Sequence, residues 1–157
     1  MGREDQTDRG ERASQSDVMP EIELTLPMLP DMELTAGKTA SAMGEHIRMS
    51  PDKIDEIRMA VIEACINAFE HSRAPDRTVS IGFKILSLDD KPTGLEITIS
   101  DQGVGFQPNQ VEEPEIGHKL TASRKRGWGL KIIQGLMDEV DIRSDSEGTT
   151  VIMRKLL

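Results

Sequence analysis

This sequence has a single cysteine, Cys65, so no disulfide can form within the chain and a disulfide-stabilised secreted domain is excluded. Cys65 lies in a segment with helical apolar spacing, which predicts a small buried core residue. The sequence also has no apolar run long enough to span a membrane and no signal peptide with a hydrophobic core. We therefore expect a cytoplasmic protein.

Basic residues are also in the minority. The 19 Lys and Arg residues are outnumbered by 28 Asp and Glu residues, giving a formal charge of −9. Nucleic acids and anionic membranes both require a basic surface, so the charge argues against either as the main partner. An acidic surface instead suits a basic protein partner.

Two common phosphate-binding motifs are missing. No Gly-x-x-x-x-Gly-Lys-Ser/Thr loop occurs, and neither Gly-x-Gly pair completes a dinucleotide fingerprint, because Pro108 and Ile132 occupy the positions of the third glycine. P-loop and Rossmann folds are therefore disfavoured.

The 157 residues suffice for one domain preceded by a polar segment. Residues 1–19 have almost no large apolar side chains, which predicts a disordered tail before a domain at 20–157. Alternating and helical patterns predict the following elements: strand 21–26, helices 34–49 and 51–72, strands 78–86 and 95–100, helix 127–137, and strands 140–143 and 149–154. This order favours an α/β two-layer sandwich, with helices on one face of a largely antiparallel sheet.

A polar row lies along the second predicted helix. Glu63, Asn67 and His71 are spaced four residues apart, so they share one helix face. A carboxylate, an amide and an imidazole in an otherwise apolar helix are costly unless they border a polar cavity or are hydrogen-bonded. The row predicts a cation-assisted phosphate site, although His71 fits a capping or core hydrogen bond equally well.

Two glycine pairs follow. Asp101-x-Gly103-x-Gly105 comes after a predicted strand, where the carboxylate can accept from an exocyclic amine such as that of adenine. The same residues also fit an ordinary Asx-type turn. Gly127-x-Gly129 opens the third predicted helix, where free backbone N–H groups favour phosphate binding.

The stretch between the two glycine pairs has little periodicity. A structureless loop of this length in a compact domain is usually a functional lid or disordered. For residues 107–126 we expect a lid that is mobile without nucleotide and ordered with it.

The order of these motifs resembles the GHKL superfamily of ATP-binding domains, and within it the bacterial anti-sigma factor serine/threonine kinases, over roughly residues 20–157. Glu63-Ala-x-x-Asn67-Ala-x-x-His71 is similar to the N box of that family. The segments 101–106 and 126–133 resemble its G1 and G2 boxes, and Gly148-Thr149-Thr150 resembles its closing Gly-Thr motif.

The resemblance implies the Bergerat fold, with ATP and Mg²⁺ as cofactors. It implies that Glu63 is the general base, Asn67 the magnesium ligand and Asp101 the adenine anchor. The nucleotide-contacting residues that it implies are Asn67, Asp101, Gly103, Gly105, Arg126, Gly127, Gly129, Leu130 and Thr149.

The function implied by the resemblance is that of an anti-sigma factor which phosphorylates a Ser or Thr of an anti-anti-sigma protein of the STAS type. Its partners would be a sigma factor, that antagonist and a second copy in a homodimer, with no direct contact to nucleic acid or membrane. An ATP-gated binding module without kinase activity is the alternative, and the presence of Glu63 favours the kinase. A histidine kinase is disfavoured because no convincing phospho-acceptor helical hairpin precedes the motifs.

Overall fold

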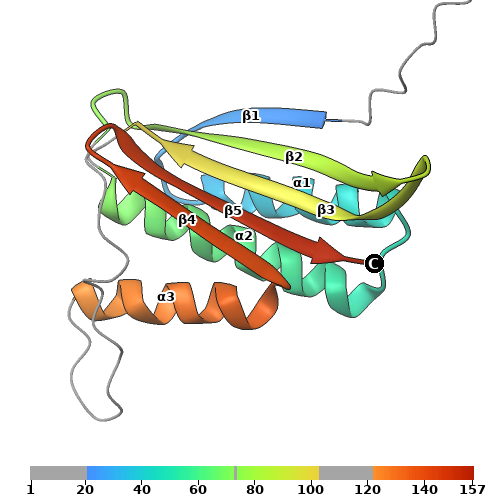
Figure 1. The fold of residues 1–157 in the computed structure, drawn as a ribbon. Helices are drawn as coiled ribbons and strands as arrows, with labels where there is room; N and C mark the ends of the chain where they lie inside the picture. Colours follow the sequence, from blue (N-terminus) through green and yellow to red (C-terminus); the bar gives the residue numbers. More distant parts are fainter. Residues whose placement is uncertain (1–20, 73, 103–121) are drawn as a thin grey trace, which may run out of the picture.

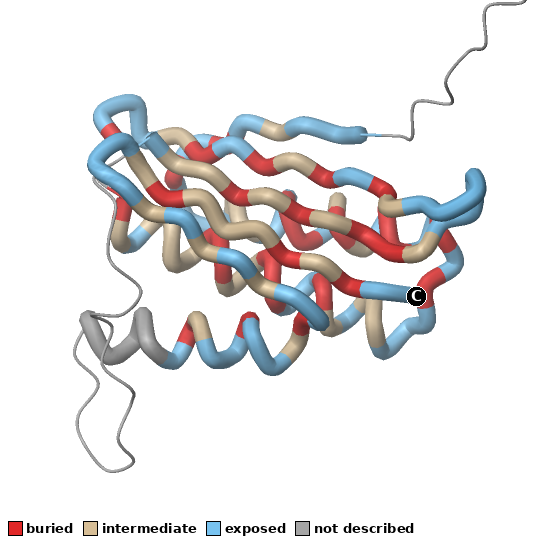
Figure 2. The backbone as a smooth tube through the Cα atoms, in the orientation of Figure 1, coloured by how far each residue is buried: buried red, intermediate tan, exposed pale blue. Residues whose placement is uncertain are grey.

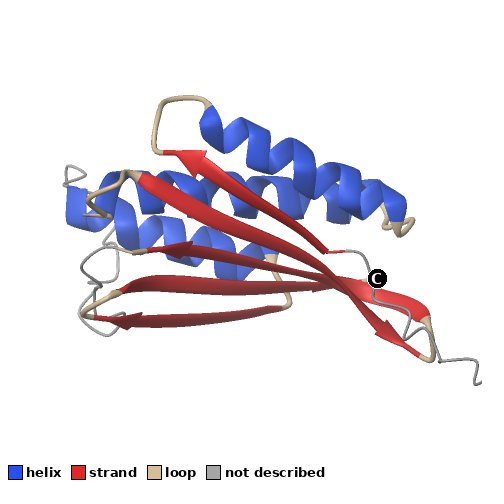
Figure 3. Ribbon diagram, turned by 90° about the horizontal axis from the view of Figure 1, so that it is seen from above, coloured by secondary structure: helices blue, strands red, loops and turns tan. Residues whose placement is uncertain are grey.

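The computed structural model describes residues 21–72, 74–102 and 122–157. Within these residues the chain forms a layer of helices over a five-stranded antiparallel sheet with the order β1-β2-β3-β5-β4 (Figure 1). The elements are β1 (Glu21–Pro27), α1 (Met32–His46), α2 (Pro51–His71), β2 (Thr78–Leu88), β3 (Lys91–Asp101), α3 (Ala122–Leu136), β4 (Glu139–Asp145) and β5 (Gly148–Leu156). The helices share one face of the sheet, as predicted (Figure 3).

The core lies between the sheet and α2. Buried residues alternate along the central strands, where Ile81, Phe83 and Ile97 are almost fully enclosed (Figure 2). Helix α2 contacts both α1 and α3 and buries Ile57 and Cys65, which confirms Cys65 as a core residue. No helix in the described part of the chain is long and apolar enough to cross a membrane.

Helix α2 begins where its sequence predicts. Ser50 is the N-cap, its side chain accepts from the Lys53 N–H at 3.5 Å, and Pro51 occupies the first turn. Proline suits this position because the missing N–H would have no partner within the helix.

Several element boundaries differ from the predictions. Helix α1 begins at Met32 and ends at His46, so its predicted bounds of 34–49 were shifted towards the C-terminus. The β2–β3 hairpin is longer than predicted, because the connection shrinks to Asp89 and Asp90, whose φ angles of 49° and 61° match a tight primed turn. Helix α3 begins at Ala122, five residues before its predicted start at 127. The tail predicted at 1–19 and the lid up to residue 121 lie outside the described residues.

Arg77 holds the C-terminal end of α2. Its backbone is left-handed, with φ of 53°, and its guanidinium donates to the carbonyls of Ser72 at 3.1 Å and Phe69 at 3.3 Å. These carbonyls belong to the last turn and the cap of α2, whose partial negative charge a cation stabilises. Arg77 thereby fixes the end of α2 that carries His71.

Replacing Arg77 by Asn should lower the free energy of unfolding by about 1–2 kcal/mol, because two charge-assisted hydrogen bonds are lost. Asn tolerates a left-handed backbone, so the substitution introduces little strain. The control is Arg143→Asn on β4, where the exposed arginine pairs with Asp141 and a change within about 0.5 kcal/mol is expected. Urea denaturation measures both, and equal stability of the two variants would contradict the assigned role of Arg77.

Candidate functional site

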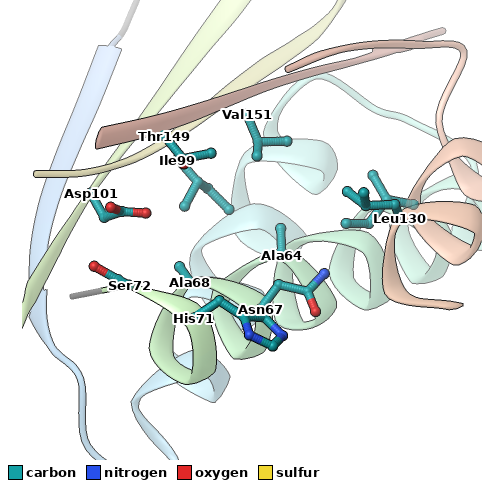
Figure 4. Close-up of a pocket in the computed structure, with 11 residues that line it drawn as sticks. Ala64, Asn67, Ala68, His71, Ser72, Ile99, Asp101, Leu130, Thr149 and Val151 are labelled. Atoms are coloured by element: carbon teal, nitrogen blue, oxygen red, sulfur yellow. The ribbon is translucent and has the colours of Figure 1, made fainter. Parts of the chain in front are cut away.

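A pocket lies between α2, the ends of β3 and β5, and α3 (Figure 4). It encloses about 520 Å³ of empty space, part of it open to solvent. Its walls are mainly apolar with a few polar groups: Ala64, Asn67, Ala68, His71, Ser72, Ile99, Asp101, Leu130, Ile133, Thr149 and Val151. This composition is typical of a site in which a few polar groups orient an organic ligand.

The α2 wall carries the polar row predicted from sequence. Asn67 and His71 line the pocket one turn apart, and the small side chains of Ala64 and Ala68 leave room beside them (Figure 4). Within the described residues, the Nδ2 atom of Asn67 is buried and has no hydrogen-bond partner. An unsatisfied buried amide is costly, so this group fits a ligand that completes its hydrogen bonding.

The opposite wall is formed by the sheet. Asp101 at the end of β3 and Thr149 at the start of β5 are cross-strand partners, and both line the pocket. Gly148 has a φ of 152°, and a Cβ there would overlap the carbonyl oxygen of Asp101. Glycine at this position therefore allows β5 to begin directly beside the Asp101 backbone.

Helix α3 lies against the polar row at Gly129. A Cβ added to Gly129 would lie 2.5 Å from Asn67 Nδ2 and 2.7 Å from Glu63 Oε1. Glu63 therefore lies under α3 and does not line the pocket itself.

Burial raises the pKa of Glu63, and the negative charge of Glu70 adds to the effect. A raised pKa makes the Glu63 carboxylate a better proton acceptor.

The structure brings together some of the residues predicted from sequence. Asn67, Asp101, Leu130 and Thr149 line one pocket, and Glu63 adjoins Asn67. The predictions for Gly103 and Gly105 lie outside the described residues.

The prediction that the second glycine pair opens a helix was wrong. Because α3 begins at Ala122, the backbone of Arg126, Gly127 and Gly129 lies within the helix, and Gly129 is well beyond the first turn. Its N–H is thus not one of the free donors of a helix N-terminus. Because Gly129 has no side chain, α3 can instead pack close to α2 at this position.

Sequence reasoning missed several apolar lining residues. Ile99 and Val151 were assigned to strands without a part in the site, yet each is two residues from a predicted site residue, Asp101 or Thr149. Side chains two apart on a strand share a face, so this spacing carried the missing signal. Ser72, at the C-cap of α2, had no comparable signal.

Comparison with known proteins gives consistent matches. Residues 26–155 match the family described as histidine kinase-like ATPase domain. The serine-protein kinase RsbW of Bacillus licheniformis is 34% identical over 142 residues, covering 87% of this chain and 85% of that protein. The corresponding protein of Bacillus subtilis strain 168 is 31% identical over 141 residues, with coverage of 87% and 85%.

A solved structure supports the same fold. The crystal structure of the RsbU and RsbW domains of Rv1364c from Mycobacterium tuberculosis superposes with a TM-score of 0.63. The match has 20% sequence identity and covers 88% of this chain and 33% of that chain.

Alanine substitutions at two glycines of α3 should differ in their effect on stability. Gly129→Ala should gain less stability than Gly135→Ala, because its new methyl group must displace the ends of the Asn67 and Glu63 side chains, which offsets the gain in helix propensity. Gly135→Ala meets nothing within 4 Å and should raise the free energy of unfolding by up to about 1 kcal/mol through helix propensity. Denaturant unfolding of both variants measures the difference, and equal stabilisation by both would contradict the close packing at Gly129.

Proposed function

This chain belongs to the histidine kinase-like ATPase (GHKL) family, and we propose that it is a cytoplasmic anti-sigma factor with serine/threonine protein kinase activity. In this proposal it binds ATP with Mg²⁺, sequesters a sigma factor and phosphorylates an anti-anti-sigma protein of the STAS type. Its similarity to serine-protein kinases over most of both chains supports the kinase activity.

One observation carries the assignment of the nucleotide site. The pocket has an acceptor, Asp101, on the sheet wall and an unsatisfied amide, Asn67, on the α2 wall. An adenine amine would donate to the Asp101 carboxylate, and the apolar side chains of Ile99 and Val151 would lie beside the base. The phosphates would then extend towards Asn67.

The residues present also fit a magnesium ion. The Asn67 amide offers an oxygen and a nitrogen, and a half-turn of the amide exchanges them, so it can face either a cation or a phosphate oxygen. Among the described residues no three His, Cys, Asp or Glu side chains cluster to hold a metal. Mg²⁺ keeps several waters and binds phosphate oxygens readily, so a single protein oxygen from Asn67 is sufficient. When bound, the ion would neutralise phosphate charge.

Glu63 is the proposed general base. Its carboxylate would take the proton of the substrate Ser or Thr hydroxyl as the oxygen bonds to the γ-phosphorus. The bond from that phosphorus to the β,γ-bridging oxygen breaks, and ADP leaves. Helix α3 passes close to Glu63 at Gly129, so the position of α3 limits the directions from which a substrate hydroxyl could approach Glu63 Oε1.

The closeness of α3 to Glu63 is the observation behind the alternative function. If α3 kept the substrate hydroxyl away from Glu63 with nucleotide bound, the protein would bind ATP without transferring phosphate. It would then act as an ATP-gated binding module for its protein partners. The sigma factor, the antagonist and a homodimer are common to both proposals.

Substitutions of Glu63 and Asn67 separate the two functions. Glu63→Gln should leave ATP affinity nearly unchanged and slow phosphate transfer by roughly 10²-fold or more, because only the proton acceptor is lost. Asn67→Ala should weaken both binding and transfer through loss of the metal ligand. The assay follows radiolabelled phosphate from ATP to a STAS-type protein recovered from the native cell. If no phosphate is transferred by the wild-type protein, the gated binding module replaces the kinase.

Substitution of Asp101 tests the proposed position of the adenine ring. Asp101→Asn replaces an acceptor with a group that can also donate, which should weaken ATP binding by about 1–3 kcal/mol. Asp141→Asn, on the exposed face of β4, serves as a control that removes the same charge outside the pocket. Calorimetry measures ATP affinity, and equal affinities of the two variants would rule out the proposed role of Asp101.

A further inference from the structure

A row of three polar residues crosses the sheet at the pocket. Asp101 on β3 pairs with Thr149 on β5, and Thr149 in turn pairs with Ser144 on β4. The hydroxyl oxygens of Ser144 and Thr149 lie 3.0 Å apart, within hydrogen-bond distance. Thr149 is only 9% exposed and lines the pocket, whereas Ser144 stands behind it and is not a lining residue.

The proton arrangement of this pair determines what Thr149 offers to a ligand. A hydroxyl has one proton and two lone pairs, so a Thr149 that accepts from Ser144 keeps its own proton for another acceptor. A Thr149 that donates to Ser144 offers only lone pairs. Asp101 beside it is acceptor-only when ionised, and therefore selects a base with an amine. On adenine the ring nitrogen next to that amine is an acceptor, which requires a donor from the protein or a bridging water.

We propose that Ser144 is a positioning residue for base recognition, which donates to Thr149 Oγ1 and so directs the Thr149 proton towards the acceptor edge of the base. This inference rests on the proposed ATP site. Asp101 then presents an acceptor for the adenine amine, and Thr149 presents a donor for the adjacent ring nitrogen. Hypoxanthine presents the reverse pattern, with a carbonyl in place of the amine and a protonated ring nitrogen.

The sheet supplies a matched control. Ser100 Oγ and Thr150 Oγ1 form the same kind of cross-strand hydroxyl pair at 3.1 Å. Each residue is adjacent in sequence to a member of the row, so this pair points to the opposite face of the sheet. Ser100 lines a polar hollow on that face, away from the helices. Ser144→Ala and Ser100→Ala each remove one cross-strand hydroxyl pair, but only the first pair adjoins the pocket.

The test is calorimetric titration of the wild-type protein and both variants with ATP and with inosine triphosphate, each with Mg²⁺. Ser144→Ala should weaken ATP binding about 3- to 10-fold, the range expected for one hydrogen bond, and should change inosine triphosphate binding less. The ratio of ATP affinity to inosine triphosphate affinity should therefore fall. Ser100→Ala should leave both affinities within about twofold of wild type, and Ser144→Thr, which retains the hydroxyl, should restore the ratio.

Two results would overturn the inference alone: an unchanged affinity ratio in Ser144→Ala, or an equal fall in Ser100→Ala. The second result would indicate a general effect of sheet stability, which thermal unfolding of both variants would register. Failure of the wild-type protein to bind either nucleotide would instead overturn the proposed function, and this inference with it.

Discussion

The packing of α2 against both the sheet and α3 is the constraint on which the site depends. One face of the helix must be apolar, and it buries Ile57 and Cys65 in the core. An adjacent face carries Glu63 and Asn67, which α3 partly covers at Gly129. Polar groups so close to the core are costly unless they have partners, and Asn67 Nδ2 has none within the described residues. A bound ligand would offset this cost.

The register of the sheet is the second feature on which the site depends. The Asp101–Thr149–Ser144 row combines residues from three strands, so it exists only with the observed pairing of β3, β5 and β4. A slip of one residue would turn each of these side chains to the other face. Gly148 permits the close approach of β5 to Asp101 that this pairing requires. Gly148 is therefore needed both for the pairing of the strands and for the site.

Local patterns were sufficient to predict the polar row, the order of the elements and the antiparallel sheet. They failed for the start of α3, because the Ala122-Ser-Arg-Lys-Arg126 segment has no apolar periodicity to mark a helix. They failed again at Lys91, where a nearby proline and glycine suggested a loop but pairing with β2 extends the strand. The contact of Gly129 with Glu63 joins distant segments, and no local pattern encodes it.

The central claim is that Asn67 and Asp101 bind opposite ends of one metal–nucleotide complex. A crystal structure of the protein with a non-hydrolysable ATP analogue and Mn²⁺ in place of Mg²⁺ tests it most directly, because anomalous scattering locates the ion. We expect a manganese peak bound to the Asn67 side-chain oxygen and an adenine amine donating to the Asp101 carboxylate. A nucleotide bound outside this pocket, or a manganese ion without Asn67 as a ligand, would contradict the claim.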